Sequence, residues 1–119
     1  MLRSIHFFSI KPGADEKRML HLMDNEFAEY AKTFGCIERK TWKLLDSGSP
    51  SLSVQSETLT LKWEPTRSAA YMNEGLWPSQ KEADAFGNTE PPADVKKLLD
   101  ELFSGIEIEN TVRYVDTEG

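Results

Sequence analysis

The chain has 119 residues, of which 39% are hydrophobic and 29% are charged, and these fractions are typical of a single globular domain over residues 1–119. It carries 14 basic and 20 acidic residues, for a net charge of −6, and its basic residues are dispersed. Because nucleic-acid affinity depends on neutralising phosphates, this balance argues against a nucleic-acid partner. No stretch approaches the roughly 20 apolar residues of a membrane span, and no secretory signal pattern is present, so we expect a cytoplasmic protein without a membrane partner.

Residues 2–10 predict a central β-strand. Ile5 and Phe7 alternate on one side of this strand, and Phe8 shares the other side with His6. A strand that is apolar on both sides usually has something packed against each of them.

An amphipathic helix is predicted next. Lys11-Pro12-Gly13 breaks the strand, Glu16 places an acidic group in the first helical turn, and Gly35 is suited to cap the helix end. Apolar residues recur between them at spacings of three and four, which draws a single stripe: Leu20, Met23, Phe27, Tyr30, Ala31 and Phe34.

The middle of the chain predicts two strands joined as a long hairpin. Residues 37–45 have one polar and one mixed face, as edge strands do, and residues 54–63 alternate leucines and Trp63 with threonines. Residues 46–51 are rich in turn formers and are predicted to be the loop between the two strands.

A second helical region is predicted from Pro65 to Glu74, where Pro65 suits a first helical position. Trp77 is placed in the loop that follows, and Ser79 with Glu82 has the spacing of a capping box for a short helix.

The chain is predicted to end with a helix and a strand. Apolar residues over 95–103 form another helical stripe that Gly105 ends. Residues 106–115 alternate as a strand, with Glu107, Glu109 and Arg113 expected on one polar face.

This order predicts an α+β fold of the ferredoxin-like β-α-β-β-α-β type, with an antiparallel sheet, both helices on one face, and an extra short helix in the second crossover. The other face is left uncovered although the first strand is apolar on both sides. Burial of apolar surface contributes roughly 25 cal/mol per Å², so we expect two such sheets to face each other in a homodimer, as a dimeric α/β barrel.

Two segments of the sequence resemble the dimeric α/β-barrel superfamily, which includes the antibiotic-biosynthesis monooxygenase, stress-responsive barrel and EthD-like families. Phe8 to Glu16 is similar to the strand, Lys-Pro-Gly turn and acidic helix start of these proteins. Leu59 to Ala70 is similar to their third strand, which ends in Trp before an alanine-bearing helix.

The resemblance implies a cavity whose monooxygenase members use an Asn, a Trp and a His. Trp63 matches the Trp, but residues 71–74 contain no His where those members carry one, and the first strand contains no Asn. This departure argues against haem chemistry, so no cofactor is predicted.

The candidate catalytic residues are His6, Trp63 and Tyr71. An imidazole that titrates near pH 6.5 can act as an acid, a base or a ligand, although a histidine in such a strand is more often a packed residue bonded to the backbone. The candidate ligand-binding residues offer planar or hydroxyl-bearing surfaces: Phe8, Trp42, Thr60, Trp77 and Tyr114.

The sequence gives little support for a disulfide, a reactive cysteine or a metal site. His21 is expected at the surface, and the single cysteine, Cys36, is expected to be a small buried hydrophobe that forms no internal disulfide. With two histidines and one cysteine at no metal-ligand spacing, no metal site is predicted.

Two functions remain open at this point. In the first, the protein binds a small hydrophobic or aromatic molecule in its cavity and acts as a cofactor-free, monooxygenase-like enzyme. In the second, it is a non-catalytic ligand-binding or dimerisation module. A pocket of several hundred Å³ that His6 shares with a tyrosine would favour the enzyme.

Overall fold

The computed structural model describes the backbone of residues 1–46, 48–55, 58–65 and 69–118, and the side chains of residues 1–46 and 69–118. A four-stranded antiparallel sheet has the order β2-β5-β1-β6. Its strands are β1 (Leu2–Ile10), β2 (Glu38–Lys43), β5 (Tyr71–Trp77) and β6 (Ile106–Val115).

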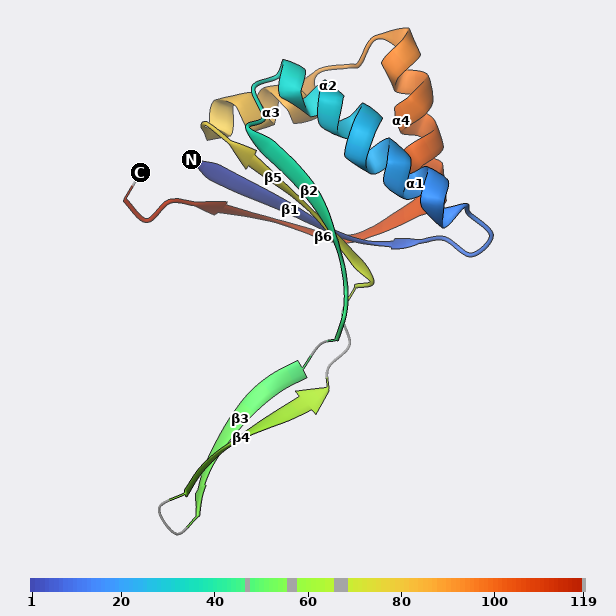
Figure 1. Cartoon of the computed structure of the whole chain (residues 1–119). Helices are drawn as coiled ribbons and strands as arrows, with labels where there is room; N and C mark the ends of the chain where they lie inside the picture. Colours follow the sequence, from blue (N-terminus) through green and yellow to red (C-terminus); the bar gives the residue numbers. More distant parts are fainter. Residues whose placement is uncertain (47, 56–57, 66–68, 119) are drawn as a thin grey trace.

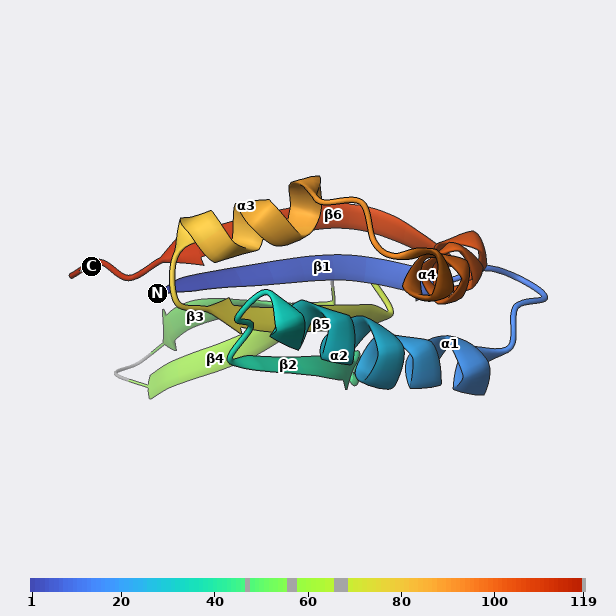
Figure 2. The ribbon, with the colours of Figure 1, turned by 90° about the horizontal axis from the view of Figure 1, so that it is seen from above.

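The helices cover one face of this sheet and leave the other face bare (Figure 1). Seen from above, α3 runs along β1 and β6, while the first helix lies over β2 and β5 (Figure 2). The helical segments are α1 (Glu16–Leu22), a π-helical turn η1 (Met23–Phe27), α2 (Ala28–Thr33), α3 (Gln80–Asn88) and α4 (Ala93–Gly105).

Several sequence predictions are confirmed. The strands at 2–10 and 106–115 have the predicted bounds, and β2 is an edge strand. Helix α3 begins at the predicted cap, where the Ser79 Oγ accepts a hydrogen bond from the Lys81 N–H at 3.3 Å and also bonds to the Glu82 carboxylate. The short helix therefore starts where the capping box indicates.

The prediction of a helix over 65–74 is wrong at Pro65 and over 69–74, and its residues 66–68 lie outside the described residues. The loop predicted at Trp77 is also wrong. Residues 71–77 form the central strand β5, in which Tyr71, Asn73, Gly75 and Trp77 are buried in strict alternation. Ala69, Ala70 and Met72 are good helix formers, but helix propensity is only a weak preference, and pairing with strands on both sides outweighs it. Trp77 is 1% exposed and closes this strand.

The predicted long hairpin of residues 37–45 and 54–63 is also wrong. Strand β2 pairs with β5, whereas β3 (Gly48–Gln55) and β4 (Thr58–Pro65) pair only with each other in a separate two-stranded sheet. Residues 48–51, predicted as loop, belong to β3. This second hairpin projects away from the four-stranded sheet (Figure 1).

A β-bulge at Glu109 changes the predicted faces of β6. Phe8 pairs with Ile108 and Phe7 pairs with Asn110, so Glu109 is the extra residue. Beyond the bulge the alternation is inverted. Arg113 consequently lies opposite Ser4 on the helix-covered face, and it does not share a face with Glu107 as predicted.

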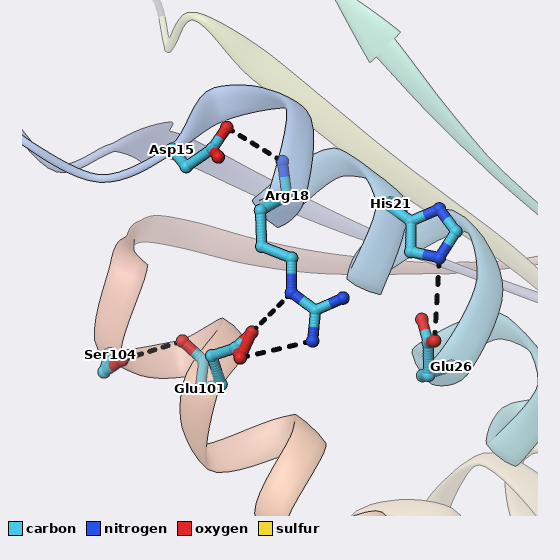
Figure 3. A network of polar contacts seen from close by, with 6 residues as sticks. All are labelled: Asp15, Arg18, His21, Glu26, Glu101 and Ser104. Atoms are coloured by element: carbon cyan, nitrogen blue, oxygen red, sulfur yellow. Dashed lines mark hydrogen bonds and ion pairs between the residues drawn. The ribbon is translucent and has the colours of Figure 1, made fainter.

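The core lies between the sheet and the helices. Its larger part is formed by ten buried residues: Phe8, Met19, Leu22, Met23, Phe27, Tyr30, Tyr71, Leu99, Leu102 and Ile106. At the surface, Arg18 of α1 donates to the Glu101 carboxylate of α4 through Nε at 2.7 Å, and His21 lies beside Glu26 (Figure 3). The Arg18 contact ties the two helices together across the edge of this core. Over the described ranges, no helix is long and apolar enough to cross a membrane.

Candidate functional site

The helix-covered face of the sheet carries two adjacent rows of polar positions that run across the strands. The first row consists of Thr41, Asn73, His6 and Thr111, taken from β2, β5, β1 and β6 in that order. The second row lies two residues away from the first in each strand. It consists of Arg39, Gly75, Ser4 and Arg113. Sheet faces that helices cover are normally apolar, so these two rows call for an explanation.

Apolar residues border the polar rows on both sides. Leu2 and Trp77 flank the second row, and Phe8, Tyr71 and Ile108 flank the first. The covered face is therefore a polar band between two hydrophobic bands.

A cavity of about 530 Å³ lies over this polar band, between the sheet and the helices. Its polar floor includes Ser4, His6, Arg39 and Thr111. Pockets of this size, with mostly apolar walls and a few placed polar groups, are typical of small-molecule sites. Its walls are largely aromatic and aliphatic: Phe8, Met23, Phe27, Tyr30, Trp77, Phe86, Leu99, Phe103 and Ile106.

The π-helical turn η1 contributes to these walls. It replaces regular α-helix at residues 23–27, and its buried residues Met23 and Phe27 both line the cavity. Single π-turns inside α-helices are rare and are often found at functional sites.

Arg39 is the charged group on the cavity floor. Its guanidinium carbon lies 4.7 Å from the centroid of the Phe27 ring, 5.8 Å from that of Phe86 and 5.9 Å from that of Trp77. Cations are attracted to aromatic faces at such distances. Burial lowers the pKa of this guanidinium, with the Cys36 sulfur acting in the opposite direction.

Gly75 makes room for the Arg39 guanidinium. A Cβ atom at position 75 would lie 2.4 Å from the Arg39 Nη2 and 2.8 Å from its Cζ. Any side chain at position 75 would collide with the guanidinium where it now lies. The position of the Arg39 side chain therefore depends on the glycine opposite it in the sheet.

Asn73 connects the two polar rows. Its amide group is fully buried, its Oδ1 accepts a hydrogen bond from the Arg39 Nη1, and its Nδ2 donates to the Thr41 Oγ1 at 2.9 Å. Thr41 in turn donates to the Asp24 carboxylate at 2.6 Å. This chain of bonds orients the guanidinium from one side.

His6 lies in the middle of the first row and faces the cavity. Its Nδ1 is 2.9 Å from the Thr111 Oγ1, so Nε2 is the ring nitrogen left for a molecule in the cavity. Burial, and secondly the charge of Arg39, lowers the pKa of His6 to about 4. The imidazole is therefore neutral near pH 7.

Two ion pairs lie at the rim of the cavity. Arg113 contacts Asp84 at 2.8 Å, and Lys96 contacts Asp100 at 3.1 Å, and all four side chains are at least 40% exposed. In each pair the basic and the acidic side chain neutralise each other, so the rim carries no net charge from them. Neither pair includes a residue of the cavity floor.

Tyr71 lies next to the cavity without lining it. Its ring stacks on that of Phe8 with centroids 5.4 Å apart, and its hydroxyl donates to the Glu16 carboxylate. Burial and this bond raise the pKa of Tyr71 to about 12. The hydroxyl is thus engaged by Glu16 and is not among the groups that line the cavity.

The structure divides the other predicted site residues into three groups. His6, Phe8 and Trp77 line the cavity, together with Tyr30, which was not singled out. Trp42 and Tyr114 lie on the uncovered face of the sheet and are 46% and 61% exposed. The side chains of Thr60 and Trp63 lie outside the described residues.

Two remaining predictions concern His21 and Cys36. His21 is exposed, as expected, with its Nε2 3.7 Å from the Glu26 carboxylate. Cys36 is a buried residue whose thiol donates to the backbone carbonyls of Glu38 and Leu76. Within the part of the chain that the structure describes, no group of three or more His, Cys, Asp or Glu residues is placed to hold a metal ion.

Sequence reasoning missed Arg39, Asn73 and Thr111. Arg39 and Thr111 were seen only as polar positions of alternating strands, and residue 73 was placed in a helix. The signal that could have found them was the presence of polar residues at inward-facing positions of several strands. It could be used only once the pairing of β5 between β1 and β2 was known.

Comparisons with known proteins match the fold of this chain. No family model matches its sequence, and no curated protein matches it significantly. The crystal structure of At3g17210 from Arabidopsis thaliana matches with a TM-score of 0.62 at 9% identity, over 98% of this chain and 96% of that one. HapK from Hahella chejuensis matches with a TM-score of 0.60 at 10% identity, over 100% and 95%.

A third structure is described as a dimeric protein of unknown function with a ferredoxin-like fold, from Bacteroides fragilis. It matches with a TM-score of 0.51 at 11% identity, over 97% of this chain and 95% of that one. Identities this low bear on the fold and not on the activity. The chain has the predicted α+β fold of the ferredoxin-like type.

Proposed function

We propose that this protein binds a small hydrophobic or aromatic molecule in the cavity between its sheet and its helices, and that it does so as a homodimer of the α/β-barrel type. The observation that carries the proposal is the cavity of about 530 Å³, with aromatic walls and a polar floor, on a sheet face that would otherwise be packed shut.

The uncovered face of the sheet supports the homodimer. Ile5, Phe7, Met72, Leu76 and Val112 lie there in adjacent strands, around an ion pair between Arg3 and Glu74. A contiguous face of this kind favours an interface. One structural neighbour is itself described as dimeric. Membership of the dimeric α/β-barrel superfamily, which the sequence resembles, is part of the same proposal.

A cofactor-free, monooxygenase-like reaction is the second candidate, and the free Nε2 of His6 is the observation that favours it. A neutral imidazole can accept a proton from an enolisable substrate held in the cavity. The low pKa of His6 makes this imidazole a weak base. Of the two predicted catalytic residues whose side chains the structure describes, His6 lines the cavity and Tyr71 does not, and His6 is the residue that we propose for this role.

Native mass spectrometry of the purified protein with a ligand screen tests the binding function, because it reports the oligomeric state and any retained molecule together. The planar probe 2-naphthamide can then be titrated by calorimetry. We expect it to bind the wild type, and we expect Ala83→Phe, which fills the cavity, to weaken it at least tenfold.

Ala85→Phe is the matched control for this experiment. Ala85 lies on the same helix but is exposed and does not line the cavity, so its substitution should leave the affinity unchanged. Equal affinity of both variants for the probe would show that the cavity is not the binding site.

A further inference from the structure

The charges around the cavity do not balance. Its lining holds three basic side chains, Arg39, Lys96 and Arg113, and two acidic ones, Asp84 and Asp100. Both acidic groups are ion-paired at the rim, with Arg113 and Lys96. His6 adds no charge near pH 7, since its pKa is lowered to about 4. Arg39 on the floor therefore supplies one uncompensated positive charge inside a protein whose net charge is −6.

Most of the hydrogen-bonding capacity of Arg39 is also open. A guanidinium has five N–H groups. Among the described residues, the oxygen that accepts from it is the Asn73 Oδ1, and no carboxylate forms an ion pair with it. Its Nε is buried without a hydrogen-bond partner. A buried donor left unpaired destabilises the folded state, and more so when it is charged.

The groups around Arg39 reduce this cost without removing it. Phe27, Trp77 and Phe86 place aromatic rings within 6 Å of the guanidinium carbon. Such contacts stabilise a cation but accept no hydrogen bond along its N–H directions. The guanidinium packs against the backbone of Gly75, which has no side chain that could pair with it. The arrangement holds a planar, charged fork in place and leaves it without an anion.

We propose that the cavity selects a planar aromatic molecule that carries a carboxylate, and that Arg39 binds this carboxylate at the cavity floor. The inference rests on the proposed function, since it names the class of molecule that the cavity binds. The guanidinium fork matches the two oxygens of a carboxylate. The rings of Trp77 and Phe86, which line the same cavity, supply flat surfaces for the aromatic part.

A matched pair of probes tests this inference in the full-length protein. The anion 2-naphthoate and the neutral 2-naphthamide have nearly the same shape and differ in the group that would meet Arg39. Charge-assisted hydrogen bonds contribute roughly 1.5–3 kcal/mol, so calorimetry at pH 7 should show naphthoate binding about 10 to 100 times more tightly than naphthamide.

Two variants locate the effect. Arg39→Met should abolish the preference for naphthoate and leave the affinity for naphthamide within about threefold of the wild type. Arg39→Lys keeps the positive charge but not the guanidinium fork, so it should retain part of the preference. Lys17→Met is the control, because Lys17 is exposed on α1 and does not line the cavity. It should leave both affinities unchanged.

The outcomes separate this inference from the proposed function. Equal binding of the two probes to the wild type would overturn the carboxylate preference and leave cavity binding intact, and this comparison needs no variant to fold. A preference that persists in Arg39→Met would overturn the role of Arg39. If neither probe binds, both the proposed function and this inference fail.

Discussion

At the scale of single residues, Arg39 and Gly75 show how two positions 36 apart in sequence depend on each other. The missing Cβ of Gly75 leaves the space that the Arg39 guanidinium occupies. The guanidinium is then held between Asn73 and the aromatic wall. Neither residue is informative alone, and together they form the charged floor of the cavity.

Gly75→Ala should destabilise the protein. The new Cβ would lie 2.4 Å from the Arg39 Nη2, so the guanidinium or the strand must move, at a cost of about 1–3 kcal/mol for overpacking a filled site. Urea denaturation measures the loss. The control is Gly87→Ala on α3, where a Cβ meets nothing within 4 Å and where the gain in helix propensity should raise stability by up to about 1 kcal/mol. Equal stability of both variants would contradict the packing described for Arg39.

His6 should make stability depend on pH. Its pKa is about 4 in the folded chain against an ordinary 6.5, so the unfolded chain binds the proton first as the pH falls. The stabilisation is complete above pH 6.5 and is lost between pH 6.5 and 4, by about 2 kcal/mol once the partial exposure of the ring is allowed for.

A His6→Gln variant isolates this contribution, because it lacks the titrating ring and keeps every carboxylate. Urea denaturation at pH 7, 5.5 and 4.5 should show the wild type losing more stability than the variant. Parallel losses in the two proteins would mean that the folded chain does not depress the pKa of His6.

At the scale of elements, β3 and β4 form a hairpin that is separate from the main sheet. They pair with each other, and the four-stranded sheet is complete without them. Where the hairpin leaves and rejoins the sheet, the Leu44 N–H donates to the Ala70 carbonyl at 2.8 Å, next to the pair formed by Lys43 and Tyr71. The ends of the insertion therefore already have the geometry of a tight hairpin.

Replacing residues 45–69 by Asn-Gly should leave the four-stranded sheet folded. Asn-Gly favours the two-residue turn that joins antiparallel strands, and the shorter loop should keep stability equal or raise it by about 1–2 kcal/mol. Circular dichroism and urea denaturation measure this. The same excision closed by Ala-Ala is the control and should be less stable. An unfolded Asn-Gly variant would show that the hairpin of β3 and β4 supports the four-stranded sheet. If the folded variant still binds 2-naphthamide, Thr60 and Trp63 are not part of the binding site.

At the scale of the whole molecule, the two faces of the sheet differ in composition. The covered face holds the polar band and the cavity, and the bare face carries the apolar residues proposed to meet a second copy. A stable interface of ordinary size buries about 800 Å² on each partner. The apolar part of that area contributes roughly 25 cal/mol per Å² to the free energy of association.

Phe7→Glu should dissociate the proposed homodimer. Phe7 lies on the bare face between Met72 and Asn110, where a carboxylate would be buried against the partner sheet. We expect the wild type to sediment as a dimer at micromolar concentration and the variant as a folded monomer. Ala85→Glu adds the same charge at an exposed position of α3 and should remain dimeric. A wild-type monomer at that concentration would refute the homodimer.

The local patterns of the sequence were enough for the first and last strands of the chain and for the helices. The strands of residues 2–10 and 106–115, the amphipathic helices and the cap at Ser79 depend on alternation, helical periodicity and capping chemistry, which neighbouring residues determine. The fold class followed from these elements, although one strand of the sheet is β5 and not the predicted residues 54–63.

The site depended on contacts that no local pattern reveals. Residues 71–77 become a strand because β1 and β2 pair with them on both sides, and the bulge at Glu109 turns Thr111 and Arg113 toward the helices. The sequence by itself thus determined the first and last strands and the amphipathic helices, and it pointed to His6, Phe8 and Trp77. Only the tertiary structure decided that Arg39, Asn73 and Thr111 lie beside them, because cross-strand register joins residues that are far apart along the chain.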